Sequence, residues 1–251
     1  MTTEGLLHCG TIARKADRLR RVAGPVLACV VTTLALSGCS SPPAPVVPEH
    51  HRIVIIGDSL STGYGTSPAD AWPNLINNDP AFHQGRPDLI NAAQNGSGYV
   101  SVGDNNSTFG TQVTEMVTAE TRLVVFFGSE NDIGVPPAQI GAAASQAFET
   151  VKNIAPQAAI LVVGPPSYTH NPEPERVQVR DQDRTAALQA GAQFVDPIAD
   201  GWIMDNAAEL IGPDGDHPST AGQHFLQTQM ERLIAPLIPQ NPVSAPPTPT
   251  R

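Results

Sequence analysis

Short apolar runs alternate with longer segments of mixed polarity through most of the 251 residues. The clearest run is residues 123–127, Leu-Val-Val-Phe-Phe, and residues 52–56 contain a similar run, Ile-Val-Ile-Ile. Runs of this kind are typical of strands that are buried on both faces of a parallel sheet. Three further strands are predicted at residues 88–92, 158–163 and 193–196.

Segments with helical spacing lie between these strands. Helices are predicted over residues 71–77, 109–118, 137–154, 174–190 and 219–237. Ser219 is a suitable N-cap for the last helix, and Gly191 is a suitable terminator for the helix before it. The alternation predicts one α/β domain, in which helices cover both faces of a parallel sheet of about five strands.

The first 38 residues have the composition of an export signal. Basic residues up to Arg21 precede an apolar run over residues 22–36, which is too short to span a bilayer comfortably. The sequence Leu-Ser-Gly-Cys at residues 36–39 then resembles the lipobox of bacterial lipoproteins. That resemblance implies cleavage before Cys39, acylation of this residue (as by palmitate) and an anchor on the extracytoplasmic face of the cell membrane. A plain secretory signal or an uncleaved anchor is the alternative.

Proline-rich segments flank the predicted domain. Residues 39–51 are expected to form an extended tether, and residues 239–251 are expected to form a disordered tail. Residues 52–238 are therefore assigned to the globular domain.

Charge and cysteine content exclude several classes of function. The formal net charge is −10, which disfavours binding to nucleic acid or to anionic headgroups and leaves a lipid as the means of membrane attachment. All three cysteines, Cys9, Cys29 and Cys39, precede the domain. The domain therefore has no internal disulfide, Cys-ligated zinc site or Cys nucleophile. We expect a monomer that needs no metal or cofactor.

The strand predicted at residues 52–56 leads into Gly57-Asp58-Ser59-Leu60. A serine that follows a central strand of an open α/β sheet lies at the crevice where such sheets bind ligands. Ser59 is therefore a candidate nucleophile, held in a tight turn, and its hydroxyl needs a neighbouring base. Ordinary turn chemistry is the alternative, because Gly, Asp and Ser all favour turns.

A candidate base, His217, lies in a turn before the last predicted helix. Asp214 precedes it by three residues, so its carboxylate can hold one ring nitrogen, fix the tautomer and stabilise the imidazolium. The other ring nitrogen then remains to accept a proton. Asp214 is preferred over Asp216, because the side chain of an adjacent residue usually points elsewhere. A surface turn histidine is the alternative.

Two further stretches follow predicted strands and carry neutral hydrogen-bond donors. Residues 91–99 contain Gly96 and Gly98, where a bare backbone N–H can approach a developing oxyanion. Residues 126–134 contain Asn131, whose side-chain amide is a neutral donor suited to the same task. A flexible loop and an Asn-Asp turn are the alternatives.

Taken in order, these four stretches resemble blocks I, II, III and V of the SGNH hydrolase superfamily, also called GDSL esterases and lipases. The resemblance covers roughly residues 52–237 and implies a three-layer α/β/α sandwich of flavodoxin type. It also implies hydrolysis of acyl esters through an acyl-enzyme. Separately, the chain has no Gly-x-Ser-x-Gly motif, which argues against an ordinary α/β-hydrolase.

The resemblance also implies a role for each candidate residue. Ser59 becomes the nucleophile, and His217 becomes the general base that Asp214 orients. The oxyanion hole would consist of the backbone N–H groups of Ser59 and Gly96 and the side chain of Asn131.

Two details of the match concern the donor loops. Gly96 is preferred to Gly98, because its distance from Asn91 fits the Asn-x-x-x-x-Gly pattern of the family. The third block departs from the usual Gly-x-Asn-Asp, since residues 128–132 read Gly-Ser-Glu-Asn-Asp and contain one extra residue.

The sequence therefore predicts an exported, lipid-anchored serine esterase that acts on a small-molecule, lipid or saccharide ester. The same triad would serve an O-acyltransferase that uses a cell-envelope saccharide as acceptor. A non-catalytic binding lipoprotein could also keep the fold, but the intact Ser59, Asn131, Asp214 and His217 favour an enzyme.

Overall fold

The computed structural model describes residues 51–80, 82 and 87–238. The predicted export signal, Cys39, all of the tether except its last residue, and the tail at residues 239–251 lie outside these described residues. Within the described ranges, none of the helices combines the length and the hydropathy needed to cross a bilayer.

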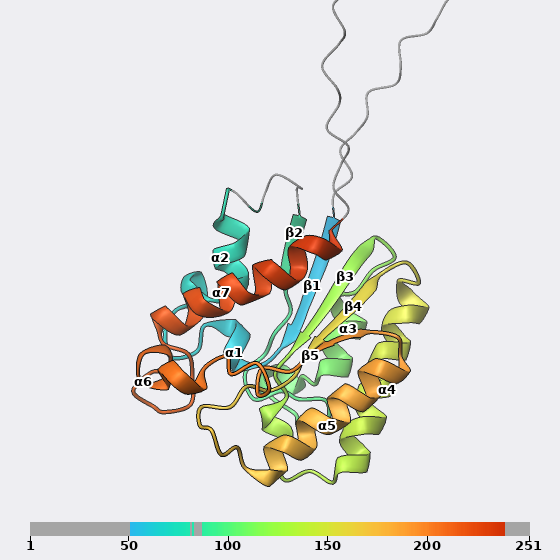
Figure 1. Cartoon of the computed structure of the whole chain (residues 1–251). Helices are drawn as coiled ribbons and strands as arrows, with labels where there is room; N and C mark the ends of the chain where they lie inside the picture. The colour runs from blue at the N-terminus through green and yellow to red at the C-terminus, as the bar shows by residue number, and fades with distance from the viewer. Residues whose placement is uncertain (1–50, 81, 83–86, 239–251) are drawn as a thin grey trace, which may run out of the picture. The chain divides into compact units, whose positions relative to one another are not determined.

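A parallel sheet of five strands forms the centre of the described domain (Figure 1). The spatial order is β2-β1-β3-β4-β5, and every neighbouring pair is parallel. This arrangement confirms the predicted α/β fold with a flavodoxin-like sheet. The strands are β1 (His51–Gly57), β2 (Pro87–Asn91), β3 (Thr121–Phe127), β4 (Ala159–Val163) and β5 (Gln193–Val195).

Helices cover both faces of this sheet. In Figure 1, α2 and α7 lie on one side of the sheet, and α4 and α5 lie on the other. Helix α3 packs in the same core as α4 and α5. The α-helices are α1 (Ser59–Thr62), α2 (Trp72–Asn78), α3 (Phe109–Met116), α4 (Pro137–Ile154), α5 (Pro174–Gln189), α6 (Ala207–Leu210) and α7 (Thr220–Ile234).

The side chains of the central strands divide between two cores. On β1, Val54 and Ile56 pack in the core with α3, α4 and α5, whereas Ile53 and Ile55 pack in the core with α2 and α7. All four side chains are fully buried. Because both faces of β1 are covered, the strand is apolar at successive positions and shows no alternation.

Most predicted elements are present, with boundaries that differ by a few residues. Helix α4 has the predicted bounds, and Ser219 caps α7 by accepting the backbone N–H of Gly222. Two one-turn helices, α1 and α6, are not predicted, because four residues are too few to show periodicity. Ser59 is expected in a tight turn, and the structure instead shows it as the first residue of the one-turn helix α1. His51, assigned to the tether, is the buried first residue of β1.

The strand order places a topological switch between β1 and β3. From β1 the chain runs outward to β2 and then crosses back to β3 on the other side of β1. Ligands of open α/β sheets bind at the carboxyl ends of strands at such a switch. Gly57 pairs with Phe127, so Asp58 and Gly128 leave the sheet side by side.

Candidate active site

The first loop of the site is α1, the single helical turn that follows β1. Asp58 caps this turn, because its Oδ1 accepts the backbone N–H of Leu60 at 3.0 Å. Gly63 ends the turn in the left-handed region, at a φ of +80° that a residue with a side chain rarely adopts. Ser59, the first residue of the turn, is thereby held at the carboxyl end of β1.

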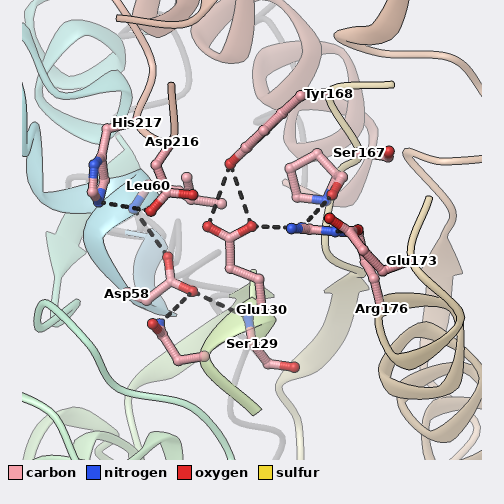
Figure 2. A network of polar contacts seen from close by, with 12 residues as sticks. Asp58, Leu60, Ser129, Glu130, Ser167, Tyr168, Glu173, Arg176, Asp216 and His217 are labelled. Carbon is pink, nitrogen blue, oxygen red and sulfur yellow. Dashed lines mark hydrogen bonds and ion pairs between the residues drawn. The ribbon is translucent and has the colours of Figure 1, made fainter. Parts of the chain in front are cut away.

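The buried carboxyl group of Asp58 also joins the first loop to the third, which follows β3 and contains residues 128–136. Its Oδ2 accepts the backbone N–H of Ser129 at 3.1 Å and lies 3.4 Å from the Nδ2 of Asn131 (Figure 2 shows the contact with Ser129). A Cβ atom on Gly128 would lie 2.3 Å from this oxygen, so glycine is required there. Burial, reinforced by the negative charge of Glu130, raises the pKa of Asp58 to about 8.

A second buried aspartate, Asp132, joins the third loop to the second, which follows β2 and contains residues 92–103. Its Oδ2 accepts the backbone N–H of Tyr99 at 2.7 Å, and its Oδ1 accepts that of Ser101 at 2.7 Å. A Cβ atom on Gly98 would lie 2.6 Å from this carboxylate. Gly98 is therefore a close-packing position against Asp132.

Gln112 of α3 is a positioning residue that the sequence does not single out. Its Oε1 accepts the backbone N–H of Gly57 at 2.9 Å, and its Nε2 donates to Gly57 O and Ser97 Oγ, each at 2.9 Å. The Gln112 side chain is buried, so it binds the end of β1 to the second loop away from water. The sequence offers one clue to Gln112: this polar residue directly precedes Val113, which lies on the face of α3 that packs in the core.

The fourth loop, residues 211–219 before α7, places the side chains of His217 and Asp214 in contact. Asp214 Oδ2 lies 2.8 Å from His217 Nδ1, and Asp214 Oδ1 accepts the backbone N–H groups of Asp216 and His217, both at 3.1 Å. These backbone bonds lower the pKa of Asp214 to about 2. An ionised carboxylate can only accept, so Nδ1 carries a proton, and in the neutral form of the ring Nε2 then has the lone pair. Asp216 lies on the other side of the ring, 4.0 Å from Nε2.

The four loops meet around a cleft of about 560 Å³. Ser59, Gly96, Asn131 and His217 all line it. Gly96 has a φ of +74°, and the Nδ2 of Asn131 donates to Ser97 O at 3.0 Å. The predicted residues are therefore brought together. In the part of the chain that the structure describes, no group of three His, Cys, Asp or Glu side chains could hold a metal ion.

The extra residue of the third loop is accommodated by a left-handed backbone and a buried ion pair. Ser129 has a φ of +78°, and Glu130 Oε2 lies 2.6 Å from Arg176 Nη1, with both side chains 9% exposed. Tyr168 donates its hydroxyl to Glu130 at 3.3 Å, and Arg176 donates to Pro166 O at 2.8 Å (Figure 2). The network ties the third loop to α5 and to the loop after β4. Neither Glu130 nor Arg176 is singled out by the sequence.

Comparison with known proteins identifies the family of this chain. The model of the GDSL-like lipase/acylhydrolase family matches residues 55–225, a range that contains Ser59, Gly96, Asn131, Asp214 and His217. The chain belongs to this family. It is thus a GDSL-type hydrolase of the esterase and lipase class.

One relative of this GDSL-type hydrolase supports the family assignment, and two solved structures match its fold. The GDSL lipase Rv0518 of Mycobacterium tuberculosis is 35% identical over 205 residues, which cover 79% of this chain and 88% of that protein. The lipase/acylhydrolase from Enterococcus faecalis matches with a TM-score of 0.62 and 18% identity, over 77% of this chain and 100% of that one. The psychrotrophic esterase EstA from Pseudoalteromonas sp. matches with a TM-score of 0.59 and 18% identity, over 74% and 97%. The two structures share the fold.

The raised pKa of Asp58 predicts a pH-dependent stability for this GDSL-type hydrolase. The unfolded carboxyl ionises near its usual 3.8, whereas the folded one keeps its proton up to about pH 8. Between these values the folded state holds the extra proton, so rising pH lowers the free energy of unfolding, by at most ~1.4 kcal/mol per pH unit. Asp58→Asn removes this loss and should gain stability relative to wild type from about pH 5 to about pH 8. Urea denaturation at several pH values measures the difference.

The matched control for this experiment is Glu115→Gln, which neutralises an exposed carboxylate on α3. Its difference from wild type should stay nearly constant over the same range. A constant difference for Asp58→Asn as well, or one that falls with pH, would contradict a protonated Asp58.

Proposed function

We propose that this GDSL-type hydrolase is a serine esterase that cleaves carboxylic esters through an acyl-enzyme. One observation carries the proposal: Ser59 lines the same cleft as His217, and Asp214 holds the Nδ1 of His217 at 2.8 Å. That contact leaves the Nε2 lone pair available to accept a proton. Ser59, His217 and Asp214 then form the catalytic triad.

In the first half of the reaction, Ser59 Oγ attacks the ester carbonyl carbon. The new C–O bond forms as His217 Nε2 takes the hydroxyl proton, and the carbonyl oxygen becomes an oxyanion. Asp214 stabilises the imidazolium through the proton on Nδ1. When the intermediate collapses, the ester C–O bond breaks and His217 protonates the leaving alcohol, so Ser59 remains acylated.

The oxyanion is stabilised by neutral donors on three loops. The proposed donors are the backbone N–H groups of Ser59 and Gly96 and the Nδ2 of Asn131. The bond from Asn131 to Ser97 O positions the third donor, and the buried side chains of Asp58 and Asp132 hold the loops that carry the donors before substrate arrives. Donors that need no reorganisation stabilise developing charge best.

In the second half, water replaces the alcohol. His217 Nε2 removes a proton from the water as its oxygen attacks the acyl carbon, and a second oxyanion occupies the same donors. Collapse breaks the bond to Ser59 Oγ, which regains a proton from His217. The products are one carboxylic acid and one alcohol, and the enzyme returns to its starting state.

Substitution of the nucleophile gives a first prediction. Ser59→Ala should lower kcat for hydrolysis of a short p-nitrophenyl ester by about 10³-fold or more, because no acyl-enzyme can form. Ser145→Ala, which changes an exposed serine on α4, should leave kcat within about twofold of wild type. The proposal fails if Ser59→Ala keeps most of the rate.

The depressed pKa of Asp214 gives a second prediction, on pH. Because this pKa is about 2, Asp214 is ionised throughout the range from about pH 5 to about pH 9. Because the general base must also be neutral, the comparison is made at about pH 8, where Asp214→Asn should lower kcat by about 10² to 10⁴. Rates of wild type and variant at that pH give the ratio.

The control for this experiment is Asp216→Asn, which neutralises the neighbouring carboxylate and keeps Asp214. A loss at least as large for Asp216→Asn would identify Asp216 as the orienting carboxylate. A wild-type to Asp214→Asn ratio near one at about pH 8 would contradict the role of Asp214.

We further propose that the enzyme is exported and anchored to the membrane by a lipid on Cys39. The basic segment, the apolar run over residues 22–36 and the Leu-Ser-Gly-Cys sequence support this assignment. Acyl chains supply the hydrophobic surface that an acidic domain needs to stay on an anionic membrane. The active site would then lie on the extracytoplasmic side of the membrane.

Removal of the acylated cysteine tests the anchor. In a bacterial host that processes lipoproteins, Cys39→Ser should abolish incorporation of labelled palmitate and move the protein from the membrane fraction to the soluble fraction. Cys29→Ser, within the predicted signal, is the matched control and should change neither result. Unchanged palmitate labelling of Cys39→Ser would contradict the assignment.

A further inference from the structure

The wall of the active-site cleft has an unusual composition for an esterase that would bind a long acyl chain. Beyond Ser59, Gly96, Asn131 and His217, the cleft is lined by one aromatic ring, two carboxylates, one amide, Val102 and Gly103; the four polar or aromatic residues are Tyr64, Asn95, Asp104 and Asp216. The side chain of Val102 is largely exposed, so it lies at the rim. An aliphatic chain laid in this cleft would cover two carboxylates, which is costly.

Asp104 and Asn95 form a prearranged polar edge. The Nδ2 of Asn95 donates to Asp104 Oδ2 at 3.0 Å, and the backbone N–H of Asp104 donates to Asn95 O at 2.8 Å. Thr62, in α1, donates its hydroxyl to Asn95 Oδ1 at 2.6 Å. This edge is therefore tied to the same helical turn that holds Ser59. Each carboxylate oxygen accepts more than one hydrogen bond, so Asp104 keeps capacity for ligand hydroxyls.

Tyr64 supplies an aromatic surface beside the candidate base. The residue is 52% exposed, and the centroid of its ring lies 4.4 Å from that of His217. Gly63 and Gly65, on either side, both have left-handed backbone angles that present the ring at the cleft. Aromatic rings have a large apolar face, and the C–H face of a sugar ring is suited to pack on it.

Asp216 provides a second hydroxyl acceptor in the lining of the same cleft. Its Oδ2 lies 4.0 Å from His217 Nε2 (Figure 2), and its backbone N–H is fixed by Asp214 Oδ1. Hydroxyls of an alcohol bound in this cleft near His217 would therefore find two carboxylates in its lining, Asp104 and Asp216. We propose that the alcohol portion of the substrate is polyhydroxylated, as in an O-acylated saccharide, with Tyr64 as its platform. This inference rests on the proposed esterase function.

A quaternary ammonium alcohol is the rival suggested by two carboxylates and a ring. Such cations are usually bound in cages of several aromatic rings. Among the described residues that line this cleft, Tyr64 is the only Phe, Tyr or Trp. Amide and carboxylate groups arranged beside one ring fit hydroxyls better, so the cation becomes an outcome of the test.

The test compares three acetate esters that differ in the alcohol: methyl 6-O-acetylglucopyranoside, ethyl acetate and acetylcholine. The full-length protein is used in detergent, and acid release gives kcat/KM for each. The saccharide ester should exceed ethyl acetate by about 10-fold or more. Asp104→Ala should reduce that preference about 5-fold or more, mainly through KM, and Asp104→Asn should reduce it less because it keeps one acceptor oxygen.

Two further variants separate the platform from a purely structural role. Tyr64→Phe should keep the preference, since the ring remains, whereas Tyr64→Leu should reduce it about 5-fold. Glu115→Gln is the control for charge and should keep both rates. A wild-type preference for ethyl acetate or acetylcholine, or equal rates for the saccharide ester and ethyl acetate, overturns the inference while Ser59-dependent esterase activity still stands. Loss of Ser59 dependence with every ester would overturn the proposed function itself.

Discussion

A backbone that leaves a sheet loses its ladder partners, and buried N–H groups then need other acceptors. In this domain the buried carboxyl groups of two aspartates are those acceptors at the catalytic edge of the sheet. Asp58 accepts N–H groups from the first and third loops, and Asp132 accepts N–H groups from the second. The three loops are therefore held to one another by side-chain to backbone hydrogen bonds in a region shielded from water. The rest of the site depends on this constraint.

The same constraint explains the glycines around the site. Gly98 and Gly128 lie directly against the two carboxylates, where a Cβ atom would be 2.6 Å or less from an oxygen. Such close approach is possible only without a side chain. In the sequence these glycines suggest flexible loops. At these two positions, however, close packing requires glycine. Gln112 adds a third side chain of the same kind, with its amide bound to Gly57 and Ser97.

Fixed loops matter because the proposed chemistry depends on position. The nucleophile lies on a one-turn helix, and the candidate oxyanion donors come from the ends of β1, β2 and β3. The base, His217, lies in the fourth loop, far along the chain, and its ring is oriented by Asp214. Preorganised donors stabilise a developing charge more than mobile ones do. The ion pair between Glu130 and Arg176 extends the support of the third loop outward to α5.

The sequence predicts those features of this protein that depend on local patterns of residues. Burial on both faces makes β1 and β3 continuous apolar runs, so both are predictable, and a spacing of three residues is enough to suggest Asp214 as the partner of His217. The supporting residues are different, because their roles appear only when distant segments meet. Glu130 and Arg176 are 46 positions apart, and the function of Asp132 depends on a loop that starts more than thirty positions earlier. The one-turn helix that carries Ser59 is also too short for a periodic signal.

The central claim is that these loops converge to make one activated serine. Treatment of the protein with a fluorophosphonate, followed by peptide mass spectrometry, tests it most directly. The account predicts one phosphonyl group per molecule, on Ser59, and almost no labelling of His217→Ala under the same conditions. Labelling of another serine, or no labelling of the wild-type protein, would contradict it.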